Sequence, residues 1–281
     1  MQTVIGLGKA GCQIADSFNS YPQYNILKID EGLEESSGSL GLKHQPSPEF
    51  YEANVPDLKT FFKEVKSEVL FITSCGTVSG SALQILKQIP NKSKVTIMYV
   101  VPNLVGLSET KRLQNNLLFN VFQEYARSAV FKDIILVDNK KISDMMGDIP
   151  ILQYWPKLNE IIVSMYHMLN VLKHSKPLFT TFGERVDTAK ITTIGLVDWQ
   201  EEKENLLFKL DIPREKRYYY AIPQVMLEED TTLMTRIEKQ VKKSVEHDKM
   251  RISYGIYSTQ YTEPYVYCES NSSMIQKLSA L

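Results

Sequence analysis

The sequence has few cysteines, no long apolar run and almost no net charge, and each absence excludes a class of protein. The three cysteines, Cys12, Cys75 and Cys268, are far apart and odd in number, which argues against disulfides or a zinc site and for a reducing compartment. No apolar run approaches the roughly 18 residues that a membrane span needs. The net charge of −1 indicates no polyanion or membrane-surface partner. We therefore expect a cytoplasmic protein that contacts neither membranes nor nucleic acid directly.

The sequence does have the patterns of a large globular α/β protein. Over residues 1–140, short apolar runs alternate with helical patterns, which predicts a parallel sheet with helices on both faces. Ligands of such sheets bind at the carboxyl ends of the strands. After residue 175, aromatic strands that alternate with period two predict a smaller α+β domain with a mixed sheet.

The expected strands are Thr3–Ile5, Tyr24–Ile29, Val69–Ile72, Lys94–Val101, Asp133–Val137, Ile191–Val197, Tyr218–Pro223, Arg251–Ser258 and Tyr265–Glu269. The expected helices are Cys12–Asn19, Asp57–Val65, Ser108–Ser128, Lys157–Leu172, Gly183–Lys190 and Thr231–His247, with a further helical pattern from Ala82 to Ile89. Residues 32–49 are rich in Gly, Ser and Pro and are expected to form a surface loop. The helix after Pro156 is apolar over more than half of its circumference, which indicates an internal helix.

Two glycine turns follow strands in the first half of the chain. Residues 6–11 read GxGxxG after a strand, with Asp30 about 20 positions on, which is the dinucleotide-binding fingerprint but also suits another phosphate ligand. Residues 74–80, SCGTVSG, lie between a buried strand and a helix, where backbone N–H groups can point at one anion. No Gly-Lys-Ser/Thr closes this second turn, so it is not a P-loop. An ordinary turn between strand and helix is its alternative interpretation.

Four motifs, in this order, resemble those of the tubulin/FtsZ superfamily. Residues 8–14, GKAGCQI, are similar to the first nucleotide loop of tubulins, G-Q-A/C-G-x-Q-I, and residues 74–80 resemble the signature G-G-G-T-G-S/T-G. Residues 138–142, DNKKI, resemble the P-N-D-K-L of FtsZ proteins. Residues 154–160, YWPKLNE, are similar to the A-F-G-A-A-N-D that starts the core helix of that family.

The resemblance implies an architecture and a ligand. It implies a Rossmann-like GTPase domain over residues 1–153, a long central core helix over residues 154–174, and a C-terminal activation-type domain over residues 175–281. It further implies GTP or GDP as ligand, with Mg²⁺ held mainly by phosphate oxygens and water. The implied partner is another copy of the chain, joined head to tail in a filament. An adaptor or DNA-binding protein is a further candidate partner, and the compact sequence is typical of phage or plasmid members.

The same resemblance implies which residues bind the nucleotide. In the family an aromatic residue stacks on guanine, and an Asn and an acidic residue of the core helix bind its Watson–Crick edge. The matching residues here are Trp155 for the aromatic residue, and Asn159 and Glu160 for the Asn and the acid. A carboxylate accepts from the guanine N–H groups that adenine lacks, which favours GTP over ATP. The alternatives are a core role for Trp155, a solvated first turn for Asn159 and Glu160, and a plain strand end for Asp30. The expected nucleotide-binding residues are Gly8, Lys9, Ala10, Gly11, Cys12, Gln13, Gly76, Thr77, Val78, Ser79, Gly80, Asn139, Trp155, Asn159 and Glu160.

The hydrolytic residues of the family are not at their usual places. Family members hydrolyse GTP on assembly through a loop, typically N-x-D-F-A-D, that reaches the phosphate of the next subunit. The same register here contains Thr180, Phe182 and Arg185. Glu184 and Asp187 are near enough to be candidate catalytic residues, whereas Arg185 could bind the phosphate of the neighbour. We therefore expect hydrolysis to be weak or lost.

Two other functions remain open. A tubulin-like scaffold that hydrolyses nothing would explain the altered catalytic loop. An NAD-dependent oxidoreductase would use residues 6–11 and Asp30, but it leaves residues 76–80 and 155–160 unexplained. Nor does the sequence contain a convincing catalytic His or Tyr–Lys pair for that chemistry.

Overall fold

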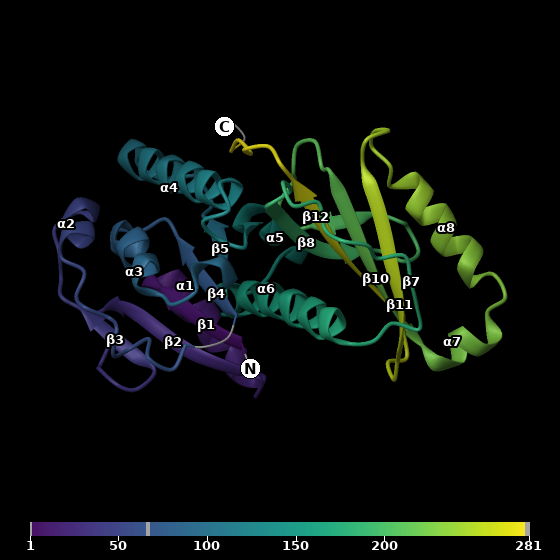
Figure 1. Cartoon of the computed structure of the whole chain (residues 1–281), viewed down its shortest axis with the longest axis horizontal. Coiled ribbons are helices and arrows are strands. Elements are labelled where there is room, and N and C mark those ends of the chain that lie inside the picture. Colours follow the sequence, from purple (N-terminus) through teal and green to yellow (C-terminus); the bar gives the residue numbers. More distant parts are fainter. Residues whose placement is uncertain (1, 66–67, 279–281) are drawn as a thin grey trace. The chain divides into compact units, whose positions relative to one another are not determined.

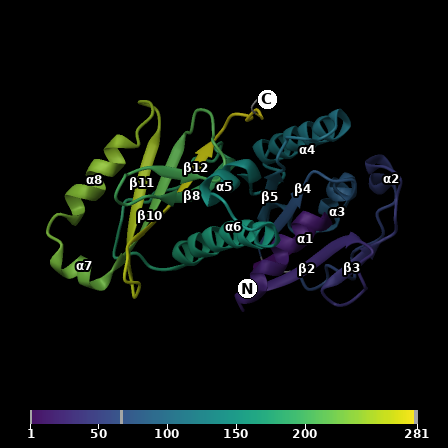
Figure 2. The same cartoon turned by 180° about the vertical axis from the view of Figure 1, so that it is seen from behind.

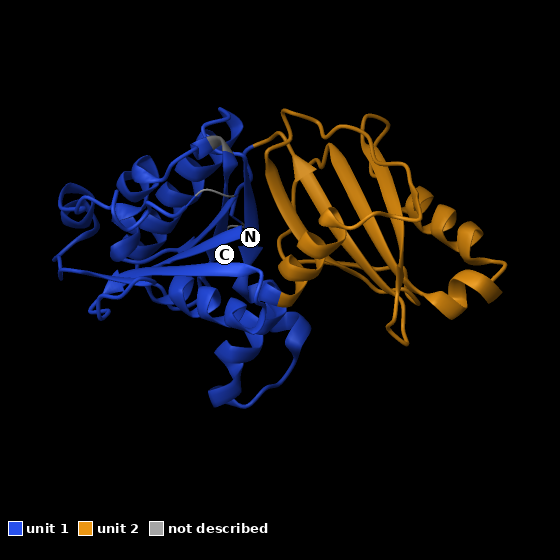
Figure 3. Ribbon diagram, turned by 60° about the horizontal axis from the view of Figure 1, so that its bottom comes forward, with its two compact units in different colours: residues 1–163, 275–281 blue, residues 164–274 orange. Residues whose placement is uncertain are grey.

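The computed structural model describes residues 2–65 and 68–278, in two compact units. Unit 1 comprises residues 1–163 and 275–281, and unit 2 comprises residues 164–274 (Figure 3). The boundary falls within the long helix α6, Ile151–His174 (Figure 1). Within the described ranges, no helix has the length and hydropathy needed to cross a membrane.

Unit 1 is built on a parallel sheet with the strand order β3-β2-β1-β4-β5-β6. Every residue of β4 and β5 is buried, because helices cover both faces of such a sheet, and this is why these strands read as continuous apolar runs. The strands are β1 (Gln2–Leu7), β2 (Tyr24–Glu31), β3 (Ser39–Leu42), β4 (Val69–Ser74), β5 (Val95–Val101) and β6 (Asp133–Asp138).

The strands of unit 1 are joined by helices and turns (Figures 1 and 2). Helix α4 begins as expected, since the Ser108 hydroxyl caps it by accepting from the backbone N–H of Lys111 at 3.4 Å. The helices are α1 (Gly8–Ser17), α2 (Pro48–Ala53), α3 (Ala82–Gln88), α4 (Glu109–Arg127) and α5 (Asn139–Met146), with the short 3₁₀ helices η1 (Phe18–Ser20), η2 (Val78–Ser81) and η3 (Lys92–Lys94).

Unit 2 is a mixed sheet with the order β8-β12-β10-β11-β7, and β9 pairs with β8. All the pairs are antiparallel except β10 with β11. Helix α8 packs on this sheet, with Leu233 and Ile237 in the same core cluster as Tyr218 and Tyr220 of β10. The elements are β7 (Phe179–Thr180), β8 (Ile191–Val197), β9 (Glu204–Leu206), β10 (Glu215–Pro223), α7 (Gln224–Glu229), α8 (Leu233–Lys243), β11 (Arg251–Thr259) and β12 (Tyr265–Ser272).

The expected α/β class and all the expected strands are confirmed, whereas several helices and loops are corrected. Residues 57–65 are not helical and include turns over residues 59–64, although Leu58 and Phe62 are buried as the apolar pattern required. Residues 183–190 are not helical, and the loop over residues 32–49 contains β3 and the start of α2. Helices α5 and α7 were not expected, and α1 begins at Gly8. Helix α6 begins at Ile151, with Pro156 inside it and not in its first turn.

Candidate functional site

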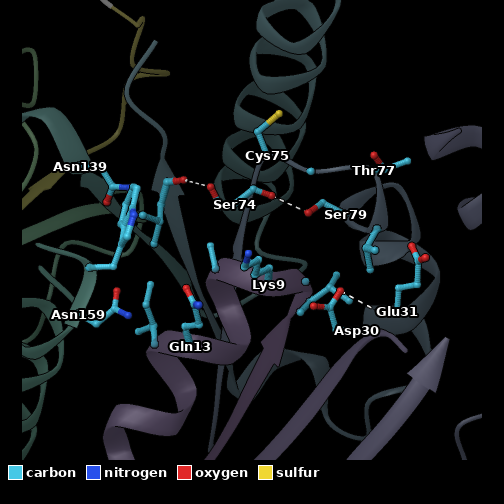
Figure 4. Close-up of a pocket in the computed structure, with 18 of the residues that line it drawn as sticks. Lys9, Gln13, Asp30, Glu31, Ser74, Cys75, Thr77, Ser79, Asn139 and Asn159 are labelled. Atoms are coloured by element: carbon cyan, nitrogen blue, oxygen red, sulfur yellow. Dashed lines mark hydrogen bonds between the residues drawn. The ribbon is translucent and has the colours of Figure 1, made fainter. Parts of the chain in front are cut away.

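A cavity of about 520 Å³ lies in unit 1, at the carboxyl ends of its parallel strands (Figure 4). It brings together residues that are distant in the sequence, from the segments that follow β1 and β4, from the end of β2, from the start of α5 and from the first part of α6. Of the residues expected to bind nucleotide, those that line it are Gly8, Lys9, Ala10, Gln13, Gly76, Thr77, Val78, Ser79, Asn139, Trp155 and Asn159. Leu7, Ile14, Asp30, Glu31, Ser74, Cys75, Val100 and Leu158 complete the lining.

The first glycine turn packs so tightly that two of its positions exclude a side chain. A Cβ on Gly11 would collide with the carbonyl oxygen of Ile72 in β4, and one on Gly6 would collide with the backbone of Gly11. Gly8 has a positive φ of 72°, a conformation that side chains disfavour. This packing brings the N-terminus of α1, with its partial positive charge, to the cavity.

Gly11 and Cys12 support the turn from behind and do not line the cavity. The Cys12 thiol donates weak hydrogen bonds to the carbonyl oxygens of Gly6 at 3.4 Å and Ile29 at 3.6 Å. Burial, with the nearby charge of Asp30, raises the pKa of Cys12 to about 12. Cys12 is therefore a packing residue at this turn.

The second glycine turn is held closed by its own hydroxyl groups. Ser79 Oγ donates to the carbonyl oxygen of Ser74 at 2.6 Å, and Ser74 Oγ donates to that of Val100 at 2.6 Å (Figure 4). The backbone N–H of Ser79 is also used within the turn, since it donates to the carbonyl of Gly76 at 3.0 Å. The buried Ser79 side chain thus stabilises the turn, and a ligand would meet backbone N–H groups and the exposed Thr77 hydroxyl.

Contacts with α4 and α2 position the same turn. Gln114 Nε2 donates to the carbonyl oxygen of Gly76 at 2.8 Å, and the Cys75 thiol donates to that of Lys111 at 3.4 Å. A Cβ on Gly80 would collide with the backbone of Pro48 at the start of α2. Gly80 therefore acts behind the cavity wall, and the side chains of Ser74 and Cys75 each have a structural partner.

One end of the cavity carries two nearly buried asparagines. Figure 4 shows Asn139 and Asn159 on the side opposite Thr77, Ser79, Asp30 and Glu31, with Lys9 and Gln13 of α1 between the two sides. Asn139 is only 7% exposed, and its Oδ1 is buried without a hydrogen-bond partner among the described residues. Its backbone position is fixed, because Asp138 caps α5 by accepting from the N–H of Lys140 at 2.8 Å. A buried acceptor without a donor is costly, so this atom is suited to a ligand N–H or O–H group.

Trp155 and Glu160 differ in their relation to the cavity. Trp155 is 52% exposed, lines the cavity and meets Tyr154 edge-on with ring centroids 5.0 Å apart. Glu160 lies outside the lining, and its exposed carboxylate forms an ion pair with Lys157 at 2.8 Å. Lys157 and Glu160 are three residues apart on a helix, a spacing that favours an ion pair, and this spacing is the sequence signal for a solvated position of Glu160.

Two carboxylates, Asp30 and Glu31, form an acidic edge at the end of β2. Burial raises the pKa of Asp30, and the charge of the adjacent Glu31 adds to this effect, whereas the hydrogen bond from the backbone N–H of Glu31 and the positive charge of Lys9 oppose it. Glu31 accepts from the Tyr51 hydroxyl at 2.6 Å and contacts His44 Nδ1 at 2.7 Å, and these bonds lower its pKa. Glu31 was missed as a lining residue, although its place at the carboxyl end of a strand was a signal.

No group of three or more His, Cys, Asp or Glu in the part of the chain that the structure describes could hold a metal ion. A divalent cation at this cavity would therefore need ligand oxygens from a bound phosphate and from water, as Mg²⁺ commonly has.

The candidate catalytic residues Glu184 and Asp187 lie in unit 2, on the segment between β7 and β8. Both side chains are exposed, and neither carboxylate has a hydrogen-bond or ion-pair partner among the described residues. Arg185, between them, is bound within its own unit to Glu269 and Asn271, at 2.8 Å in each case.

Comparison with known proteins shows the fold. No family model matches the sequence, and no curated protein matches it significantly. A GTPγS-form protofilament of Bacillus thuringiensis serovar israelensis TubZ matches with a TM-score of 0.68 at 14% identity, over 98% of this chain and 87% of that chain. The GDP-bound monomer of CetZ1 from Haloferax volcanii matches with a TM-score of 0.69 at 14% identity, over 97% of this chain and 94% of that chain. An empty FtsZ dimer from M. jannaschii matches with a TM-score of 0.66 at 14% identity, over 96% of this chain and 88% of that chain.

These similarities confirm the fold expected from the order of the four motifs. The chain has the tubulin/FtsZ fold, with a parallel N-terminal sheet, the long helix α6 and a mixed C-terminal sheet.

Proposed function

We propose that the chain binds GTP or GDP in the unit 1 cavity and self-associates head to tail into filaments. Asn139 carries the proposal, because its buried Oδ1 has no hydrogen-bond partner among the described residues and the residue lines the same cavity as two glycine turns suited to phosphate. In this proposal residues 1–153 are the nucleotide-binding domain, residues 154–174 the core helix, and residues 175–281 the C-terminal domain.

The phosphates would lie between the two glycine turns. Backbone N–H groups at the start of α1 and in the second turn would donate to phosphate oxygens, aided by the partial positive charge of the helix terminus. The Lys9 ammonium and the Thr77 hydroxyl would add side-chain donors. A Mg²⁺ ion would screen the phosphates from Asp30 and Glu31.

The guanine base would lie at the asparagine end. Asn139 Oδ1 would accept a hydrogen bond from one N–H group of the base. The Asn159 amide would form hydrogen bonds with the edge of the base, and the Trp155 ring would stack on its face. Glu160 would contribute only after it leaves Lys157, which costs little because both side chains are exposed.

Self-association is supported by the assembled forms of the similar structures and by exposed apolar side chains on α6. The similar structures include a protofilament and a dimer. Ile151 and Leu152 are 86% and 88% exposed, one helical turn before the cavity residue Trp155. Exposed apolar side chains grouped in this way mark interaction surfaces.

Two measurements on one preparation test the proposal. Titration with fluorescent GDP, in competition with GTP or ATP, should show guanine nucleotides binding at least tenfold more tightly than ATP. Light scattering should rise with protein concentration when GTP is present. Binding without scattering would reject filament formation, and equal competition by ATP would reject guanine recognition.

Replacing Asn139 with alanine should weaken GDP binding about tenfold (~1.4 kcal/mol), because the base loses an acceptor in a desolvated site. Competition titration measures the change. Asn120→Ala, at an exposed position of α4, is the matched control and should leave the affinity within twofold. An unchanged affinity in Asn139→Ala would place the base elsewhere.

Replacing Leu152 with glutamate should raise the protein concentration needed for GTP-dependent scattering at least tenfold, since a charge would be buried in the contact (~1.4 kcal/mol or more). Affinity for GDP should not change, because Leu152 does not line the cavity. Leu117→Glu is the control, a leucine 63% exposed on α4. Equal loss of scattering in the two variants would contradict a specific contact through the start of α6.

A further inference from the structure

A second cavity, of about 600 Å³, lies in unit 1. It is lined by residues 25–27 in the first half of β2, by residues 35–40 before and within β3, and by parts of the segment 57–65. Because β2 and β3 are parallel, these residues lie at the edge of the sheet opposite the first cavity. Among the described residues, none lines both cavities, so a ligand of the second cavity would not displace a nucleotide from the first.

The segment 57–65 is a fixed wall of the second cavity. The backbone N–H of Leu58 donates to Gln88 Oε1 of α3 at 2.7 Å, and Gln88 Nε2 donates to the carbonyl oxygen of Pro56 at 2.9 Å. Leu58 and Phe62 are buried, which anchors the segment in the core of unit 1. This wall is therefore formed without a ligand.

The turn before β3 is a second fixed wall. Ser36 and Ser39 exchange two backbone hydrogen bonds, at 2.9 and 3.4 Å. The Ser36 hydroxyl accepts from the backbone N–H of Gly38 at 3.2 Å. The carbonyl oxygen of Gly38 accepts from the N–H of Lys28 at 2.8 Å, which joins the turn to β2.

The outer edge of β2 is unpaired beside this turn. Alternate residues of a strand direct their backbone groups to the same edge, so Ile26 uses the outer edge as Lys28 does. Strand β3 pairs with β2 only from Lys28 and Ser39 onwards, so Ile26 has no strand partner on this edge among the described residues. Gly38 leaves room at the Ile26 carbonyl, since a Cβ there would come within 3.2 Å of its oxygen. An unpaired strand edge suits the backbone of an extended peptide.

The second cavity is also acidic. Its lining contains three carboxylates and one ammonium group, those of Glu35, Asp57, Glu64 and Lys63, and so has a net charge of −2. All four side chains are exposed, and neither Glu35 nor Glu64 has a hydrogen-bond or ion-pair partner in the part of the chain that the structure describes. This charge favours a cationic ligand.

Apolar side chains complete the lining and decide which kind of cation fits. Ile26, Leu40 and Phe61 are each partly exposed. The Phe61 ring packs on the buried Phe62 ring, with centroids 5.5 Å apart. A polyamine would pair with the carboxylates but would leave these side chains and the edge of β2 in water. A peptide with both basic and apolar residues would contact all three features.

We propose that the second cavity binds a short extended segment of a partner protein, in which lysine or arginine alternates with apolar residues. The cationic groups of this segment pair with Glu35 and Glu64. Its apolar side chains pack on Leu40 and Phe61, and its backbone bonds to Ile26 at the edge of β2. The inference does not rest on the proposed function, because it uses none of the residues of the first cavity.

Fluorescence anisotropy of three labelled peptides with the full chain tests the ligand chemistry. The first peptide alternates lysine with leucine, the second has glutamate in place of each lysine, and the third has serine in place of each leucine. We expect the lysine–leucine peptide to bind at least tenfold more tightly than either of the others. Equal binding of the glutamate peptide would overturn the inference. Equal binding of the serine peptide would also overturn it, since charge alone would then explain the binding.

Two double variants test the place of binding. Glu35→Gln with Glu64→Gln removes the two unpaired carboxylates of the lining and should weaken binding of the lysine–leucine peptide at least fivefold. Glu34→Gln with Glu109→Gln removes the same charge at two exposed positions outside the lining and should leave the affinity within twofold. Equal loss in the two double variants would overturn the inference.

Addition of GDP separates this inference from the proposed function. Saturating GDP should leave the affinity for the lysine–leucine peptide within twofold, because the two cavities are at opposite edges of the sheet. A chain that binds this peptide but no guanine nucleotide would support the inference and overturn the proposed function. A chain that binds GDP but none of the peptides would overturn the inference alone.

Discussion

Gly11→Ala should lower the free energy of unfolding by about 3 kcal/mol or more and abolish nucleotide binding, because its added methyl group has no space. The Cβ would collide with the carbonyl oxygen of Ile72, a buried residue of the central strand β4. This atom is backbone, so it cannot move aside as the end of a flexible side chain would. Helix α1 must then shift away from the sheet, and its N-terminus must leave the cavity.

Gly76→Ala is the matched control for this prediction. The nearest atom to a Cβ on Gly76 is Ser79 Oγ at 3.8 Å, an ordinary contact, and Gly76 has no positive φ. In urea unfolding, the free energy of unfolding of Gly76→Ala should lie within about 1 kcal/mol of the wild-type value. If Gly11→Ala were equally stable, close packing of α1 against β4 would not be what fixes the first turn.

The cavity could be predicted from the sequence where its geometry depends on local patterns. Glycine spacing after an apolar strand predicts a tight turn into a helix, and the carboxyl ends of parallel strands must meet at one edge of the sheet. For this reason residues 8–10, Gln13, residues 76–79 and Asn139 were expected together, and they do line one cavity.

Other features depend on partners far away in the sequence. The backbone carbonyls of Gly183 and Glu184 are held by Arg217 and Arg251, which are 34 and 67 positions away, so the helical pattern of residues 183–190 was misleading. Ser79 was expected to bind the nucleotide, but its hydroxyl donates to the carbonyl oxygen of Ser74 at the end of β4. Such competition between a local pattern and a distant partner cannot be seen in one sequence.

The buried carboxylate of Glu269 should make unit 2 sensitive to acid. Burial alone would raise its pKa, but the positive charges of Arg185, Lys173 and Arg217 together lower the pKa of Glu269 to about 2, from an ordinary value of 4.5. A folded-state pKa below the unfolded one stabilises the fold at pH values above 4.5. That stabilisation is lost as the pH falls from 4.5 towards 2, and the shift corresponds to about 3 kcal/mol.

Glu269→Gln should therefore lower the free energy of unfolding by about 3 kcal/mol at pH 7, since it leaves Arg185 and Lys173 without their countercharge. Urea unfolding followed at pH 7, 5 and 3 should show the difference from wild type shrinking only below pH 5, as the wild-type carboxylate becomes protonated in the unfolded chain. Glu263→Gln, an exposed glutamate between β11 and β12, should change the free energy of unfolding by less than about 0.5 kcal/mol at every pH. A difference for Glu269→Gln that stayed constant down to pH 3 would mean that the amide disturbs packing and that the charge of Glu269 contributes nothing. Glu269 would then hold Arg185 by hydrogen bonding alone.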